Sequence, residues 1–97
     1  MPLTGELKEF IIEGSEFSFN PSSITVNAGD RVKITFKNTG SARHNLVIGD
    51  LGVSTSLIPA GSTDTIEFTA DRSGTFAFYC SVPGHRSSGM EGQISVS

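Results

Sequence analysis

Residues 31–37 read Arg-Val-Lys-Ile-Thr-Phe-Lys, and apolar side chains occupy every second position of this stretch. Successive side chains of a β-strand point to opposite faces, so the alternation predicts a strand with one apolar face. The same period of two occurs at residues 24–26, 65–69 and 94–96. Residues 7–12, 16–19 and 44–48 are further candidate strands. The pattern therefore predicts a chain built almost entirely from β-strands.

Turn-forming residues separate these apolar stretches. They are Asn20-Pro21, Ala28-Gly29-Asp30, Asn38-Thr39-Gly40, Pro59-Ala60-Gly61 and Ser73-Gly74. Seven or eight short strands at this spacing are typical of an antiparallel sandwich or barrel. Residues 49–62 show the weakest pattern, and we expect them to form a long connection between sheets. No stretch predicts a helix longer than one turn.

Length and composition limit the classes of protein that the chain can belong to. Its 97 residues match one domain, expected to span residues 1–97. Seven Lys and Arg against ten Asp and Glu give a net charge of −3, which argues against binding to nucleic acid or to anionic lipid. The longest apolar run, residues 76–80, is far shorter than the roughly 20 residues of a membrane helix. We therefore expect no membrane insertion.

The strand expected over residues 74–80 leads into the most informative loop of the chain. Phe76, Phe78 and Cys80 share one face, so the Cys80 side chain should point inward at the end of the strand. A loop of ten residues follows, and a last strand is expected from about Glu91 to the C-terminus. The chain has a single cysteine, which cannot form an internal disulfide.

Four potential metal ligands have a distinctive spacing. Cys80, His85 and Met90 follow one another at steps of five residues, and His44 lies 36 residues before Cys80. Apart from Met1, these four are all the cysteine, histidine and methionine residues in the chain. A thiolate, two imidazoles and a thioether favour copper, with the nitrogens and the thiolate in a plane and the methionine on the axis. The sequence therefore predicts one copper ion bound at this loop.

Three segments around these residues resemble the cupredoxins, the family of small type 1 blue-copper proteins. The segments are residues 24–40, 43–48 and 78–92. The resemblance implies a Greek-key β-sandwich of seven to eight mostly antiparallel strands with copper at one end. It also implies that His44, Cys80 and His85 are equatorial ligands and that Met90 is the axial ligand.

The resemblance implies roles for neighbouring residues as well. Asn45 matches an asparagine that ties the two ligand-bearing segments together near the thiolate. Ser81 and Pro83 are expected beside the ligands, where Pro83 lacks an N–H that could donate to the sulfur.

The function expected from these residues is transfer of single electrons by copper cycling between Cu(I) and Cu(II), without enzymatic activity. Redox protein partners are expected to dock transiently near His85, and the chain is expected to be a monomer. The resemblance to this family implies that the mature protein is located in the periplasm, at the extracellular face or in a lumen. Residues 1–5 lack the features of an export signal, which leaves a mature form or a cytosolic protein.

Other functions are compatible with parts of this pattern. The chain could be a copper carrier or storage module, or the copper domain of a larger redox protein. Cys80, His85 and Asn45 are also the residue types of a thiol hydrolase. That alternative is weaker, because an activated cysteine usually lies at a helix N-terminus and Cys80 is expected at the end of a strand.

Overall fold

A computed structural model describes residues 7–97, and the N-terminal residues considered for an export signal lie outside this part. The described residues form nine strands and one short 3-10 helix, in this order. They are β1 (Leu7–Ser15), β2 (Ser18–Asn20), β3 (Ser23–Val26), β4 (Arg31–Asn38), β5 (Val47–Ile48), η1 (Gly49–Leu51), β6 (Val53–Ser54), β7 (Thr63–Thr69), β8 (Gly74–Tyr79) and β9 (Glu91–Val96).

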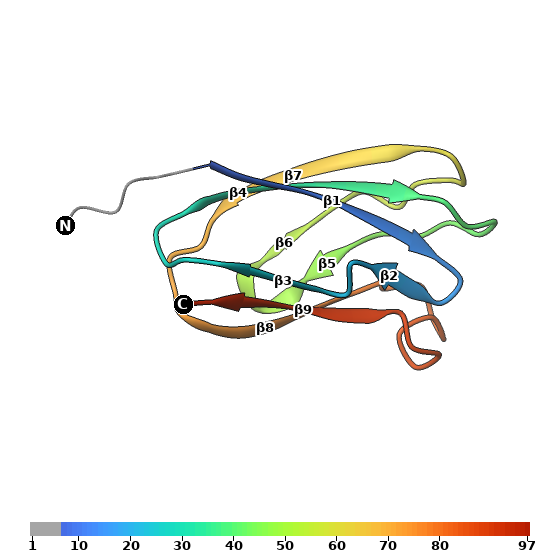
Figure 1. Cartoon of the computed structure of the whole chain (residues 1–97). Coiled ribbons are helices and arrows are strands. Elements are labelled where there is room, and N and C mark those ends of the chain that lie inside the picture. Colours follow the sequence, from blue (N-terminus) through green and yellow to red (C-terminus); the bar gives the residue numbers. More distant parts are fainter. Residues whose placement is uncertain (1–6) are drawn as a thin grey trace.

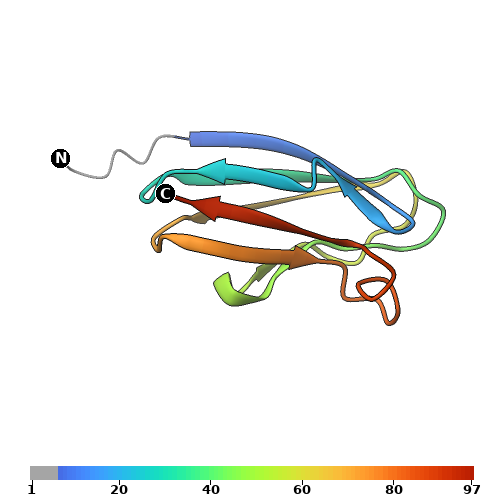
Figure 2. The ribbon, with the colours of Figure 1, turned by 60° about the horizontal axis from the view of Figure 1, so that its bottom comes forward.

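The strands form two sheets that pack as a sandwich (Figures 1 and 2). One sheet has the order β2-β1-β4-β7, and the other has the order β3-β9-β8-β5-β6. The pairs β1–β4 and β3–β9 are parallel, and the remaining pairs are antiparallel. The all-β sandwich of mostly antiparallel strands predicted from the sequence is confirmed, although the described residues form nine strands where seven or eight were expected.

Three local predictions differ from the structure. The strand expected over residues 16–19 begins only at Ser18, because Glu16 and Phe17 form the turn between β1 and β2. The strand expected over residues 44–48 is reduced to β5 and an isolated bridge between His44 and Ile58. The connection over residues 49–62 contains η1 and the two-residue strand β6, which the weak pattern there did not predict.

The core lies between the two sheets. Val32, Ile34 and Phe36 of β4 are fully buried, as the alternation in this strand predicted. They pack with buried side chains from the other strands and from the segments that flank them, namely Ile12, Phe19, Ile24, Val26, Leu46, Ile48, Ile58, Phe68, Ala70, Phe78, Cys80, Met90, Ile94 and Val96. Cys80 and Met90 thus belong to the same buried cluster as the apolar residues.

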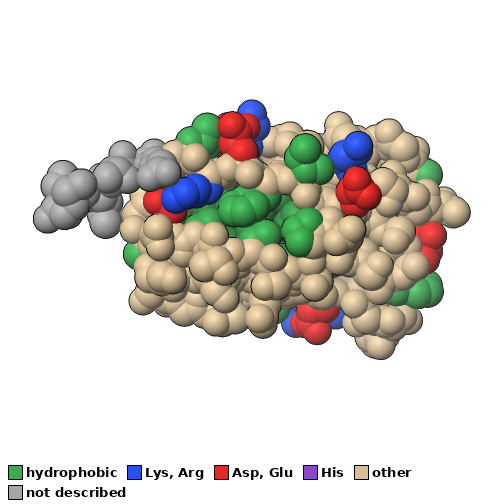
Figure 3. All heavy atoms as spheres, in the orientation of Figure 1, with side chains coloured by type: hydrophobic (Ala, Val, Ile, Leu, Met, Phe, Trp, Pro, Cys, Tyr) green, Lys and Arg blue, Asp and Glu red, His purple; other side chains and the backbone are tan. Residues whose placement is uncertain are grey.

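The outer surface of the sandwich is mixed in character. Figure 3 shows hydrophobic side chains gathered between β1 and β3, with Lys, Arg, Asp and Glu side chains around them. Within residues 7–97, no helix has both the length and the apolar character needed to cross a membrane.

Asp30 lies in the turn between β3 and β4, which is joined to the C-terminus by a hydrogen bond from the N–H of Ala28 to the carbonyl of Ser97. The turn lies at the same end of the sandwich as the C-terminus (Figure 1). Asp30 Oδ2 accepts hydrogen bonds from Lys8 Nζ of β1 and from the N–H of Asn27, both at 2.9 Å. Its backbone carbonyl accepts a hydrogen bond from the N–H of Ala70, the residue after β7. The Lys8 hydrogen bond, followed by that of Asn27, lowers the pKa of Asp30.

Asp30→Asn should make the protein's stability less sensitive to acid. The pKa of Asp30 is lower in the folded than in the unfolded chain, so its ionisation stabilises the fold above the ordinary pKa of about 3.9. This stabilisation disappears as the pH falls through the lower, folded-state pKa. We expect the variant to have a lower Tm than the parent at pH 7 and a smaller loss of Tm between pH 5 and pH 2.5.

The measurement is thermal unfolding followed by circular dichroism across this pH range. Asp71→Asn is the matched control, because Asp71 is exposed and its removal changes the net charge equally. Parallel Tm curves for Asp30→Asn and the parent protein would contradict the prediction.

Candidate metal centre

The loop between β8 and β9 lies at the end of the sandwich opposite the C-terminus (Figure 2), and the donor atoms of His44, Cys80 and His85 come together there. His44 lies there just before β5, and its ring is fully buried. Its backbone N–H and carbonyl are both paired with Ile58, at 3.2 and 3.0 Å. Two residues on, the Leu46 carbonyl accepts from the N–H of Thr55 at 2.9 Å, and the Leu46 N–H donates to the Thr55 side-chain hydroxyl at 3.0 Å. Hydrogen bonds to residues 55–58 therefore fix the backbone of residues 44–46.

The other three candidates lie in or next to the loop between β8 and β9. Cys80 is fully buried at the end of β8, and its N–H donates to the Met90 carbonyl at 3.3 Å. The N–H of Met90 donates to the carbonyl of His85 at 3.1 Å. The loop is thus closed by its own backbone, which keeps the three residues close together.

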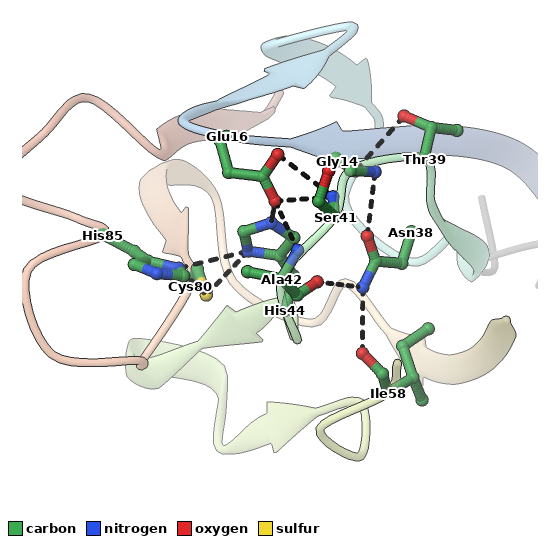
Figure 4. Close-up of polar contacts among 11 residues, drawn as sticks. Gly14, Glu16, Asn38, Thr39, Ser41, Ala42, His44, Ile58, Cys80 and His85 are labelled. Carbon is green, nitrogen blue, oxygen red and sulfur yellow. Dashed lines mark hydrogen bonds and ion pairs between the residues drawn. The ribbon is translucent and has the colours of Figure 1, made fainter. Parts of the chain in front are cut away.

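Three donor atoms converge at the centre of this cluster (Figure 4). Cys80 Sγ lies 3.7 Å from His44 Nδ1 and 3.5 Å from His85 Nδ1, and the two Nδ1 atoms are 3.1 Å apart. Bonds of about 2.0 Å to nitrogen and about 2.3 Å to sulfur, in a trigonal plane, would separate the donors by roughly 3.5–3.7 Å. The observed triangle is close to the size that one transition-metal ion requires.

Met90 is fully buried in the same region. Its terminal methyl group lies beside Gly14 of β1, so the side chain extends across the end of the sandwich toward the other sheet. The sequence prediction therefore selected four residues that the fold gathers from two distant segments.

Asn45 and Ser81 connect these two segments directly. The side-chain carbonyl of Asn45 accepts from the N–H of Ser81 at 2.8 Å, and its amide donates to Ser81 Oγ at 2.9 Å. Residues 44 and 80 are therefore linked by hydrogen bonds between their chain neighbours. Pro83 lies exposed in the loop, where it lines a shallow hollow together with Val82 and Tyr79.

Glu16 is a site residue that the sequence did not reveal. One of its carboxylate oxygens, Oε1, accepts hydrogen bonds from the N–H groups of Ser41 and Ala42 at 2.8 and 2.6 Å, and lies 2.9 Å from His44 Nε2 (Figure 4). The Ala42 N–H, followed by the His44 side chain, lowers the pKa of Glu16 to about 2. Glu16 is therefore ionised at neutral pH.

Asn38 is a second residue that the motif did not indicate. Its buried amide donates to the carbonyls of Ala42 and Ile58, both at 2.9 Å, and its side-chain oxygen accepts from the N–H of Gly40. It thus supports the loop before His44 from within. The sequence marked Asn38 only as part of a turn and not as a site residue, because its partner Ile58 lies 20 residues away.

His85 is more exposed than His44 and has an aromatic neighbour. The Phe17 ring meets the His85 ring edge-on, with centroids 5.1 Å apart. Glu16 and Phe17 are adjacent in the β1–β2 turn, so this one turn contacts both imidazoles of the cluster.

Comparison with known proteins places the chain in a family. The family profile for the cupredoxin-like domain matches residues 4–96. The parsley (Petroselinum crispum) protein plastocyanin A/B is 39% identical over 87 residues, which cover 80% of this chain and 86% of that protein.

Two solved structures extend the comparison to the fold. Dithionite-reduced auracyanin from Roseiflexus castenholzii is 28% identical, with a TM-score of 0.81 over 92% of this chain and 96% of that one. Auracyanin A, a "blue" copper protein from Chloroflexus aurantiacus, is 25% identical, with a TM-score of 0.80 over 94% and 99% of the two chains. The chain belongs to the cupredoxin family, as the resemblance of its motifs predicted.

Gly14→Ala should destabilise the protein through a clash beside the candidate ligands. A Cβ at this position would lie 2.5 Å from Cε1 of Phe36 and 3.1 Å from Cε of Met90. Both side chains are fully buried, so neither can move into solvent. We expect a loss of about 1–3 kcal/mol in the free energy of unfolding, measured by urea denaturation.

Phe36→Leu provides the test of mechanism, because it removes the ring that the new methyl group would strike. The double variant should be more stable than the sum of the two single effects predicts. Strict additivity would show that the clash with Phe36 is not the cause.

Proposed function

We propose that His44 Nδ1, Cys80 Sγ, His85 Nδ1 and the Met90 thioether hold one copper ion, and that the chain is a type 1 copper protein that transfers single electrons. The observation that supports this most strongly is the convergence of two imidazole nitrogens and one sulfur within 4.8 Å of one another. Soft sulfur ligands suit Cu(I), and imidazole suits both oxidation states. The residues present therefore fit copper.

Bound copper would supply the one-electron couple between Cu(I) and Cu(II). The task of the chain is to keep the donor atoms in place while the charge changes, because ligand movement slows electron transfer. His44 is anchored by Ile58 on its backbone, and Cys80 by Met90. The link between Asn45 and Ser81 joins the two segments, so the site is held at several points around the cluster.

His85 is the candidate port for electrons, because it is the more exposed of the two imidazoles. Its surroundings include the exposed side chains of Phe17 and Pro83 and the partly exposed Val82. A small, partly apolar surface of this kind suits redox partners that bind weakly and briefly. We place the docking site of protein partners here.

Further properties belong to the same proposal. The chain acts as a monomer, with residues 1–97 forming one copper domain, and it carries electrons without catalysing a reaction. It works at the extracellular face, in the periplasm or in a lumen. Transfer of electrons, rather than storage of the metal, predicts that copper stays bound through repeated reduction and oxidation.

Cys80→Ser should abolish the intense visible absorption of the Cu(II) protein. That absorption requires charge transfer from a thiolate to copper, and a hydroxyl group cannot replace it. The measurement is a visible spectrum after addition of one equivalent of Cu(II), with circular dichroism to verify that the sandwich is folded. A retained band in a folded variant would show that Cys80 is not the ligand.

Met90→Gln should keep the visible band and lower the reduction potential, because an amide oxygen in place of the thioether would favour Cu(II) over Cu(I). Met90→Leu is the matched control, since it keeps the buried volume but removes the donor atom. Its potential should rise. Voltammetry on the three proteins tests both expectations, and equal potentials would remove Met90 from the ligand set.

A further inference from the structure

The carboxylate of Glu16 lies on the side of the His44 ring that faces away from the other candidate ligands. In Figure 4, Glu16 contacts one ring nitrogen while Cys80 and His85 face the other. The contacts are specific: Nε2 is 2.9 Å from Glu16 Oε1, and Nδ1 is 3.7 Å from Cys80 Sγ. The His44 ring therefore stands between a carboxylate and the proposed copper position.

This arrangement determines which ring nitrogen carries the proton. An ionised carboxylate can only accept hydrogen bonds, so His44 Nε2 must be the donor. The remaining nitrogen, Nδ1, then presents its lone pair to the site. A metal-binding imidazole commonly has such a partner, which sets the tautomer and makes the ligand more basic.

The position of the carboxylate is itself fixed by backbone groups. Two N–H groups, those of Ser41 and Ala42, donate to the same oxygen that faces His44. The Glu16 side chain is 31% exposed, so its negative charge is partly removed from water. A charge in this position acts through the ring on the proposed metal with less screening than a fully exposed charge would.

We propose that Glu16 is a positioning residue of the copper centre: it orients His44 with Nδ1 toward the metal, and its negative charge lowers the reduction potential. Cu(II) carries one more positive charge than Cu(I), so a nearby carboxylate stabilises the oxidised state more. The inference rests on the ligand assignment proposed above, in which His44 binds copper.

A simpler role for Glu16 would be purely structural. Its hydrogen bonds to Ser41 and Ala42 join the β1–β2 turn to the loop before His44, and this link alone could explain the residue. A structural role predicts effects on stability with no specific change in potential. The two roles can therefore be separated by a variant that keeps the hydrogen bonds and removes the charge.

Glu16→Gln is that variant, because Oε1 takes part in the three shortest hydrogen bonds and glutamine keeps one carbonyl oxygen. It gives up only the longer contact of the Ser41 N–H with Oε2, at 3.1 Å. We expect the copper-loaded variant to retain its visible band. Its affinity for Cu(II) should fall about tenfold relative to its affinity for Cu(I). For a one-electron couple this corresponds to a rise of about 59 mV in the reduction potential, measured by voltammetry.

Glu13→Gln is the matched control. Glu13 is exposed on β1 three residues away, and its replacement changes the net charge equally. The potential of this control should move much less than that of Glu16→Gln. Equal shifts in the two variants, or an unchanged potential in Glu16→Gln with the band retained, would overturn the inference.

A measurement on the unaltered protein covers the case in which Glu16→Gln does not fold. Nitrogen-15 NMR of the Cu(I) form should show a proton on His44 Nε2 that exchanges slowly with water. A rapidly exchanging Nε2 proton would contradict the proposed hydrogen bond. If the unaltered protein shows no visible band with Cu(II), the copper assignment fails instead, so the two failures are distinguishable.

Discussion

The candidate metal site requires the fold to hold three polar donor atoms close together where water is largely excluded. Cys80 Sγ and the two histidine Nδ1 atoms lie within 4.8 Å, and Cys80 and His44 are fully buried. Two unprotonated nitrogens at such a distance would repel each other, because each would point a lone pair at the other. A bound cation would remove this repulsion. The rest of the fold must be rigid enough to keep the three donor atoms from moving apart.

The rigidity comes from contacts that cross between distant parts of the chain. Parallel pairing of β1 with β4 and of β3 with β9 brings the N-terminal half of the chain onto both sheets. At the end of the sandwich that carries the candidate ligands, the side chain of Asn38 donates hydrogen bonds to Ala42 and Ile58 and so supports the loop before His44. The hydrogen bonds between Asn45 and Ser81 join this region to the β8–β9 loop. Few of these contacts are local in sequence, so the site forms only when the sandwich is complete.

The sequence predicted the parts of this structure that follow from short-range pattern. Alternation in β4 gave both the strand and its buried face, and the spacing of Cys80, His85 and Met90 indicated the metal-binding loop. It did not predict Glu16, because an isolated glutamate in a turn has no pattern, and its partners lie 25 to 28 residues away. For the same reason the bridge between His44 and Ile58 was mistaken for part of a longer strand.

The two imidazoles of the site are held in different ways, and this difference has a functional consequence. His44 is buried, paired through its backbone with Ile58 and hydrogen-bonded on its far nitrogen by Glu16. His85 is partly exposed in a loop, and its ring packs against that of Phe17 in an edge-type contact. In the proposed centre, the more firmly held histidine would fix the geometry, and the more accessible one would bring the centre close to a partner. Because Glu16 and Phe17 are neighbours in one turn, a change in the path of that turn would affect both histidines together.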